Sequence, residues 1–188
     1  MKDLNCGVAG PIVYNVNAGT YTENLDFGLL LGATATNNVT FRGVNRDSVI
    51  LRSTGGNTIT LNGTDHLAFE DMTIRMDGSS GFTVSITGNA DHNRFENCNI
   101  INNTSVISTN ANPIVISGSS TSYFSRGPSG SYNEFIDNYV QGGYFAAYTT
   151  GASTTSPAVG NTWINNEFED AYFYGFYSYY EDSLTFHN

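Results

Sequence analysis

The sequence is poor in basic side chains, and this shortage limits what the protein can bind. Only 7 of its 188 residues are lysine or arginine, against 17 aspartate and glutamate residues, so the formal net charge is −10. Nucleic acids and anionic membrane surfaces are bound chiefly through lysine and arginine. We therefore expect neither as a partner, which leaves a glycan or a divalent cation to consider.

Cysteines are too few for a disulfide framework, and long apolar runs are missing. Whether the two cysteines, Cys6 and Cys98, pair with each other stays open. No apolar stretch near the start is long enough for a signal peptide, and none downstream approaches the run of about 20 residues that spans a bilayer. We expect no membrane insertion, and a secreted or cell-surface protein whose signal has been removed or lies upstream.

Strong helix formers are scarce, whereas glycine, asparagine, threonine and serine are abundant. These small polar residues favour turns and loops over helices, and the aromatic residues, 13% of the chain, suit pleated strands. Hydrophobic residues make up 39% of the sequence, which is enough for a core. The composition therefore predicts an all-β domain.

An aromatic residue recurs along the chain in similar surroundings. The copies read HLAFEDMTI around Phe69, HNRFENCNI around Phe95, YNEFIDNYV around Phe135 and GNTWINNEF around Trp163, with NVTFRGVN before them and SLTFHN after them. Short strands at such a period, with no helical pattern between them, are typical of a solenoid. We predict a single-stranded right-handed parallel β-helix of six to seven coils over residues 1–188, a fragment of a longer solenoid.

Polar residues recur at fixed distances from the aromatic position. Two residues after it stand Asp71, Asn97, Asp137 and Asn165, and two residues before it stand Asn93, Asn133 and Asn161. Asparagine and aspartate tolerate left-handed backbone angles, so the first set is expected to form a structural ladder at a turn. The one long coil contains residues 117–131, SGSSTSYFSRGPSGS, which we expect to be an inserted surface loop.

The repeats resemble the pectin-lyase-like superfamily, and the resemblance implies a parallel β-helix repeat protein of a secreted or cell-surface bacterial type. VYNVNAGTYTENLDF is similar to the first coil of pectinesterase-type proteins, with Gly19, Tyr21 and Glu23 in the Gly-x-Tyr-x-Glu stretch. Members of the superfamily cleave, de-esterify or epimerise acidic polysaccharides. This chain lacks the Gln-Asp and Asp-Phe-Ile-Phe-Gly motifs of the esterases and the Asn-Thr-Asp, Asp-Asp and Gly-His-Gly motifs of the hydrolases.

Two Asp-His pairs stand in equivalent places of neighbouring coils. Asp65 and Asp91 are 26 residues apart, as are His66 and His92. Stacked carboxylates about 5 Å apart repel each other unless one is protonated or a cation lies between them, so the two aspartates are the metal candidates, with calcium as the ion. The alternative, which we favour, is that both cap backbone amides in solvated turns and that no cofactor is needed.

The residue after each aromatic is expected to point outward. Glu70 and Glu96 occupy this position, so they are either an acid and base pair at the retaining-glycosidase spacing of about 5 Å or surface charges, with Arg42 beside Glu70. The catalytic candidates are the carboxylates Asp65, Asp91, Glu70 and Glu96, with His92 or Arg94 as the base.

The segment AYFYGFYSYY, residues 171–180, has aromatic residues on both faces of a predicted strand. Some rings must therefore face solvent, where they suit sugar stacking or burial by another subunit, or they pack against a missing coil. The spacing pairs Tyr144 with Tyr172, Phe145 with Phe173 and Tyr148 with Phe176. The candidates for contact with a glycan or partner are Tyr144, Tyr148, Tyr172, Tyr174, Tyr177 and Tyr179.

The chain stops just as a new repeat has begun, and no capping segment follows. An open coil end exposes unpaired backbone groups, so we expect two copies to associate end to end through the C-terminal coil. The sequence favours a non-catalytic module, either structural or in contact with a polysaccharide. The alternative is a polysaccharide lyase or hydrolase acting on acidic glycans.

Overall fold

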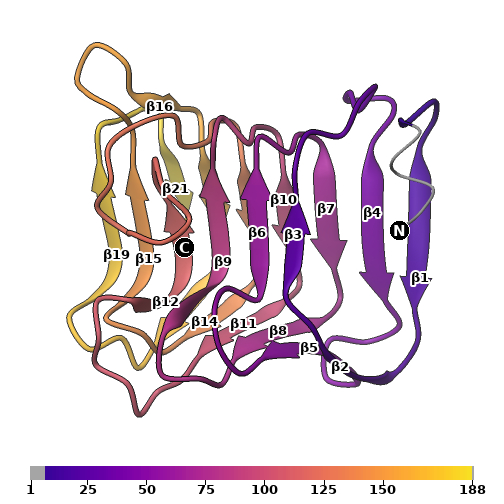
Figure 1. Cartoon of the computed structure of the whole chain (residues 1–188), viewed down its shortest axis with the longest axis horizontal. Coiled ribbons are helices and arrows are strands. Elements are labelled where there is room, and N and C mark those ends of the chain that lie inside the picture. The colour runs from indigo at the N-terminus through magenta and orange to yellow at the C-terminus, as the bar shows by residue number, and fades with distance from the viewer. Residues whose placement is uncertain (1–6, 188) are drawn as a thin grey trace.

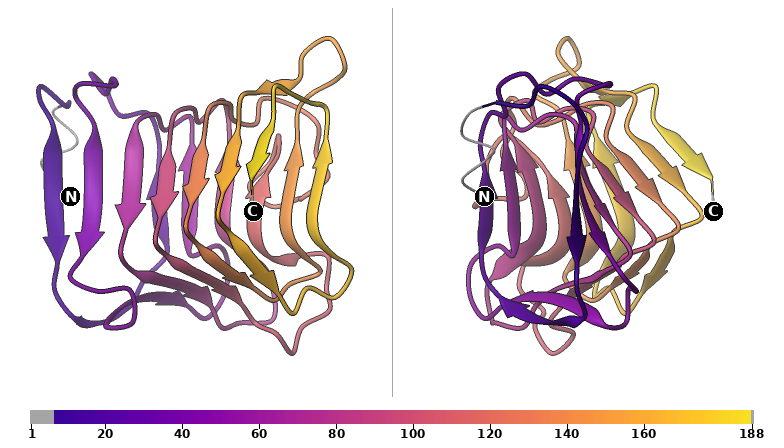
Figure 2. Two further views of the ribbon diagram at one scale, coloured as in Figure 1. Left: turned by 180° about the vertical axis from the view of Figure 1, so that it is seen from behind. Right: turned by 90° about the vertical axis from the view of Figure 1, so that its right-hand side faces the viewer.

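The computed structural model describes residues 7–187, which form a parallel β-helix (Figure 1 and Figure 2). Three sheets run along the stack, and every pairing between neighbouring coils is parallel. Within this range the chain forms no helix, and hence none long enough to cross a membrane. The predicted fold class is confirmed.

The strands are grouped by sheet. Sheet A contains β1 (Ile12–Val16), β4 (Val39–Gly43), β7 (Leu67–Glu70), β10 (Arg94–Glu96), β13 (Glu134–Ile136), β17 (Thr162–Ile164) and β21 (Thr185–His187). Sheet B contains β2 (Gly19–Thr22), β5 (Val49–Ser53), β8 (Thr73–Met76), β11 (Asn99–Asn102), β14 (Tyr139–Gln141) and β18 (Glu167–Glu169). Sheet C contains β3 (Leu25–Phe27), β6 (Ile59–Asn62), β9 (Gly81–Thr87), β12 (Ala111–Ile116), β15 (Phe145–Thr150) and β19 (Tyr174–Tyr179). β16 (Ala158–Val159) pairs with β20 (Glu181–Asp182) outside these sheets.

Each complete coil contributes one strand to each sheet. Six coils are therefore complete within the described residues, and β21 begins a seventh. This number agrees with the prediction of six to seven coils.

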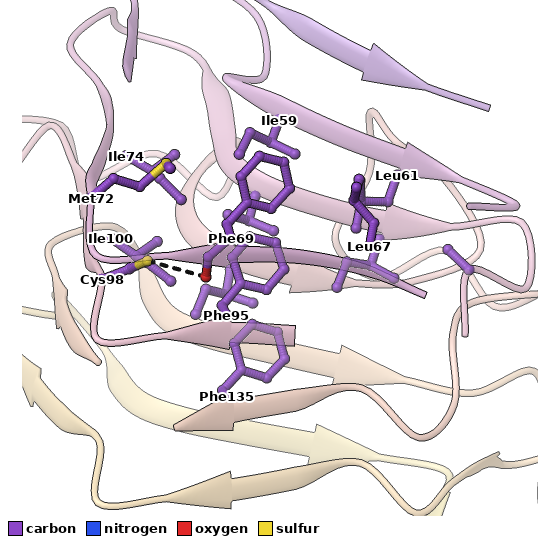
Figure 3. Close-up of a cluster of buried hydrophobic side chains, with 14 of the residues drawn as sticks. Ile59, Leu61, Leu67, Phe69, Met72, Ile74, Phe95, Cys98, Ile100 and Phe135 are labelled. Atoms are coloured by element: carbon purple, nitrogen blue, oxygen red, sulfur yellow. Dashed lines mark hydrogen bonds between the residues drawn. The ribbon is translucent and has the colours of Figure 1, made fainter. Parts of the chain in front are cut away.

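An aromatic column fills the interior behind sheet A (Figure 3). The Phe69 and Phe95 rings stack at 5.4 Å between centroids, Phe95 and Phe135 at 5.4 Å, and Phe135 and Trp163 at 4.0 Å. Residues one coil apart lie directly above one another because the strands pair in register, so like stacks on like. The repeated aromatic position is thus the centre of the core.

The turn from sheet A to sheet B is made by a single residue in the left-handed region. Its φ angle is 56° at Asp71, 50° at Asn97, 55° at Asp137 and 52° at Asn165. The side chains also interact along the column, since Asn97 Nδ2 donates to Asp71 Oδ1 at 2.6 Å. The turn is tight because asparagine and aspartate accept this backbone conformation at little cost.

A buried ladder of asparagines, Asn93, Asn133 and Asn161, lies at the other end of the sheet A strands, directly before each strand begins. Asn133 accepts the Asn93 backbone N–H at its Oδ1 (2.9 Å) and donates from Nδ2 to the Ala90 carbonyl (3.1 Å) and to Asn161 Oδ1 (3.3 Å). A second ladder, which the sequence reading missed, joins Asn138 to Asn166 28 residues later. Both ladders satisfy backbone groups where the coil bends, as buried polar groups require.

Residues 117–131 lie along the outer face of sheet C. Asn57 Nδ2 donates to the Ser120 carbonyl at 2.8 Å, and the Tyr123 and Tyr148 rings meet at 4.9 Å. Every position of β12 and β15 is buried, although a strand with one solvated face alternates buried and exposed residues. The loop therefore acts as a second layer over the middle coils of this sheet.

Candidate functional site

Aromatic side chains, most of them exposed, gather at the C-terminal end of sheet C. We call this group the aromatic surface; its members are Tyr144, Tyr148, Tyr172, Phe173, Tyr174, Tyr177 and Tyr179. Tyr172 is 58% exposed and Phe173 is 55% exposed, which is unusual for side chains of this size. All six tyrosines singled out in the sequence belong to it, and ring contacts link Tyr144 to Tyr172 and Tyr148 to Tyr177.

The predicted pairings of Tyr148 with Phe176 and of Phe145 with Phe173 are wrong, since Phe145 pairs with Tyr174. Tyr148 pairs with Tyr177, and their rings stack at 5.3 Å, whereas Phe176 packs inward at 5.0 Å from Trp163. The connection before β19 has one residue more than the connection before β15, which moves the register from 28 to 29 residues. A shift of one residue exchanges the two faces of a strand, so it turns Tyr177 outward and Phe176 into the core.

The loop over sheet C completes this surface. Phe124 and Arg126 come from the loop, and together with Tyr148, Tyr177 and Tyr179 they line an open hollow of about 580 Å³. The Arg126 guanidinium lies 5.5 Å from the centre of the Tyr179 ring and 4.8 Å from that of Tyr180, within the range of a cation–π contact. Sequence reasoning missed both loop residues because a loop's partners leave no periodic signal.

The hollow offers rings, neutral hydroxyls and a single cation. Burial raises the pKa of the Tyr148 phenol to about 12, so this hydroxyl stays protonated at neutral pH and can donate a hydrogen bond. Phe124 is 64% exposed and forms the outer wall. Such a mixture of flat apolar surface and a few polar groups is typical of a small-molecule or sugar site.

The Asp-His candidates lie in the turn that enters sheet A. Asp65 Oδ1 accepts the Asp91 backbone N–H at 2.8 Å, and Asp91 Oδ1 accepts the Ser131 N–H at 2.7 Å. Each carboxylate therefore caps the next coil, the arrangement of the favoured alternative. In residues 7–187 no three His, Cys, Asp or Glu side chains come close enough together to hold a metal ion.

The two histidines form a stacked pair beside these aspartates. The His66 and His92 rings are 4.9 Å apart at 5°, and Tyr132 continues the stack at 4.9 Å from His92. Burial, followed by the neighbouring His92, lowers the pKa of His66. The stack lies at the start of the sheet A strands, away from the glutamates at their ends.

Glu70 and Glu96 lie side by side in register on the outer face of sheet A. Arg42 Nε lies 2.7 Å from Glu70 Oε2, and Arg94 forms an ion pair with Glu96. The four side chains border an open hollow of about 620 Å³. Asp65 lies in the turn before β7, whereas Glu70 is the last residue of that strand. The candidate carboxylates therefore form two separate groups.

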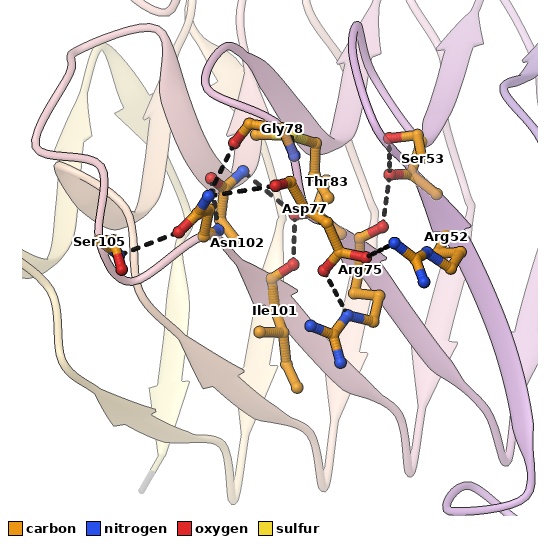
Figure 4. A network of polar contacts seen from close by, with 12 residues as sticks. Arg52, Ser53, Arg75, Asp77, Gly78, Thr83, Ile101, Asn102 and Ser105 are labelled. Atoms are coloured by element: carbon orange, nitrogen blue, oxygen red, sulfur yellow. Dashed lines mark hydrogen bonds and ion pairs between the residues drawn. The ribbon is translucent and has the colours of Figure 1, made fainter.

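A third polar cluster, on sheet B, was not foreseen from the sequence (Figure 4). Asp77 bridges two arginines, with Oδ2 2.8 Å from Arg52 Nη2 and Oδ1 2.6 Å from Arg75 Nε. Arg52 and Arg75 are partners in register, so their charges would repel without the shared carboxylate. We assign this cluster to the stability of the coil.

Cys98 is a buried free thiol. Burial raises its pKa to about 12, so it holds little thiolate at neutral pH. Its Sγ lies 3.5 Å from the Phe69 carbonyl oxygen, within the core. Cys6, the other cysteine of the sequence, lies outside the described residues.

Comparisons with known proteins returned one structural likeness. No family model and no curated protein matched the sequence. Among solved structures, a crystal structure of pectin methylesterase in complex with hexasaccharide VII matched with a TM-score of 0.44 and 14% identity, over 97% of this chain and 62% of that one. The chain thus spans less than two thirds of that protein, and the likeness concerns the fold, which the strand pairing already establishes.

Proposed function

We propose that this β-helix is a glycan-contacting module of a secreted or cell-surface protein, without catalytic activity of its own. The observation that carries the proposal is the hollow between the loop and sheet C, where Tyr148, Tyr177 and Tyr179 surround solvent-filled space beside Arg126. The C–H faces of a sugar ring pack on aromatic rings, while its hydroxyls need donors and acceptors nearby. The hollow supplies both, and its walls are held by strands and a packed loop.

The position of the candidate acid and base groups, all outside the aromatic hollow, supports a role of that hollow in binding. Glu70 and Glu96 are each held by an arginine, while Asp65 and Asp91 cap backbone amides. General acid–base catalysis requires groups within reach of one reacting point. None of these carboxylates lines the aromatic hollow.

The alternative function is a polysaccharide lyase or hydrolase acting on acidic glycans. The observation in its favour is the hollow on sheet A, where Glu70 and Glu96 face solvent beside Arg42 and Arg94. Residues in register on neighbouring strands are about 4.8 Å apart at their backbones, which is close to the carboxylate spacing of retaining glycosidases, about 5 Å. Turnover that is lost on Glu70→Gln or Glu96→Gln replacement would decide for this alternative.

Replacing Tyr177 with alanine is expected to weaken glycan binding roughly tenfold, the cost of one stacking contact of about 1.4 kcal/mol. A glycan-array screen selects the oligosaccharide, and calorimetry with and without calcium measures its affinity. The matched control is Tyr132→Ala, a tyrosine that is 48% exposed on another part of the coil and should leave affinity unchanged. Equal losses for the two variants, or no glycan bound by the wild-type protein, would overturn the proposal.

We also propose that two copies of the chain associate through the C-terminal coil. β18 and β19 are the outermost strands of their sheets within the described residues, and Phe186 next to them is 42% exposed. Light scattering should show a dimer for the wild-type protein and a monomer for Phe186→Lys, with Phe124→Lys as the control. This expectation would be contradicted if the wild-type protein had the mass of a monomer at a concentration of roughly 100 μM.

A further inference from the structure

The buried asparagine ladder ends on a carboxylate. In each step of the ladder, the Nδ2 group of one asparagine donates to Oδ1 of the next, as Asn93 does to Asn133 at 3.1 Å and Asn133 to Asn161 at 3.3 Å. Asn161 instead donates to Glu181, at 3.2 Å to Oε1 and 3.0 Å to Oε2. Glu181 therefore takes the acceptor position that an asparagine of the next coil would fill.

Nothing around Glu181 compensates a negative charge. Its hydrogen-bond donor is the Asn161 amide. The buried Thr149 hydroxyl close to it makes no hydrogen bond, and no ion pair reaches Glu181 within residues 7–187. The nearby charged groups are Asp182, which follows it and is exposed, and Arg126, which lies over the Tyr180 ring. Strand β16, which packs beside it, contributes only Ala158 and Val159.

The segment that carries Glu181 also forms one wall of the aromatic hollow. Tyr179 lines the hollow, and its carbonyl accepts the Gly151 N–H at 3.1 Å. The Tyr180 carbonyl accepts the Ala158 N–H at 3.0 Å. If the Glu181 side chain leaves its site, these backbone hydrogen bonds and the contact with Arg126 are no longer stabilised by a buried side chain in the same segment.

We propose that Glu181 is a pH-sensitive latch, which holds residues 179–182 against the coil when protonated and releases the wall of the hollow when ionised. This proposal rests on the function assigned to the hollow, which it extends by a mode of regulation. A neutral carboxyl group can accept from Asn161 without placing a charge in this site. An ionised group would remain largely buried with one amide as its main donor, which is unfavourable.

The direction of the pH effect follows from the carboxyl group itself. Burial raises the pKa of Glu181 from 4.5 to about 7 in the folded protein. A raised folded-state pKa gives a contribution to stability that is complete below the unfolded-state value and is lost as the pH rises through the folded value. The latch is therefore closed near pH 5, and it opens as the pH rises from about 6 to about 8.

Hydrogen exchange measured by mass spectrometry tests the latch without any ligand. After correction for the intrinsic pH dependence of exchange, opening of peptides covering residues 158–160 and 179–182 should rise on the order of 100-fold between pH 5 and pH 8 in the wild-type protein. Glu181→Gln should abolish this rise, since the glutamine carbonyl can accept from Asn161 and the side chain carries no charge at any pH. Asp182→Asn, at the exposed neighbouring position, should retain it. A rise that persists in Glu181→Gln would overturn the latch.

A second measurement serves if the glutamine variant does not fold. Carbon-13 NMR of labelled glutamate side chains should show one carboxyl group that titrates near neutral pH and that disappears on Glu181→Asp replacement; titration of every glutamate below pH 5 would refute the proposal. Glycan binding is then measured at pH 5.5 and pH 8 and should weaken at the higher pH. A protein with the exchange signature but no glycan affinity keeps the latch and loses the proposed function.

Discussion

Replacing Phe95 with alanine is expected to lower the free energy of unfolding by about 4 kcal/mol, the range found when a fully buried aromatic residue is truncated. Phe95 is fully buried and stacks on two rings, those of Phe69 and Phe135, at 5.4 Å each. The stacked strands cannot close the gap, because their spacing is fixed by the hydrogen bonds between coils. Urea denaturation, with the midpoint and slope both recorded, measures the loss.

The matched control for this experiment is Phe124→Ala. Phe124 is a phenylalanine too, but it is 64% exposed on the loop, so its removal should change stability by less than about 1 kcal/mol. Phe95→Leu should fall between the two. Similar losses for Phe95→Ala and Phe124→Ala would mean that the aromatic column is not the principal source of stability.

Replacing Asn133 with leucine is expected to cost about 3 kcal/mol or more, although the change makes the site more hydrophobic. Leucine leaves the Asn93 N–H and the Ala90 carbonyl without their partner in a buried region, and Asn161 Oδ1 keeps only the backbone N–H of residue 133 as a donor from this position. Each unsatisfied group costs about 1 to 3 kcal/mol. Thermal and urea unfolding should both report the loss.

Asn110→Leu is the control for the ladder experiment. Asn110 is exposed, and its side chain makes no hydrogen bond within the described residues, so stability should change by about 0.5 kcal/mol at most. If Asn133→Leu were as stable as the wild-type protein, the asparagine ladder would be a consequence of the coil rather than a cause of it.

The coil architecture was predictable because its information is periodic. Phe69, Phe95 and Phe135 repeat in the sequence and stack in the structure, since pairing in register converts a spacing along the chain into a contact. Tyr14 escaped notice, although it stacks on Phe41 at 5.0 Å, because the residues around it do not match the repeat. Asn138 and Asn166 have the right spacing and could have been found by the same method.

The candidate site was predictable only in part. The tyrosines were recognised from their density, but Arg126 meets Tyr179 across 53 positions with no repeat to connect them. Glu181 was missed for the same reason. Its strand, β20, pairs with β16, and its hydrogen-bond partner Asn161 lies outside that pair of strands. One additional residue in a turn was enough to exchange Phe176 and Tyr177 between core and surface, and local patterns do not report such a shift.

The loop over sheet C affects how the protein unfolds. Stacked repeats contact only their immediate neighbours, so an array of this kind ordinarily frays from an end, one unit at a time. Here residues 117–131 reach from Asn57 in the second coil to Tyr179 in the sixth, and they bridge units that never touch. We therefore expect the loop to make these distant repeats unfold together, in one all-or-none transition.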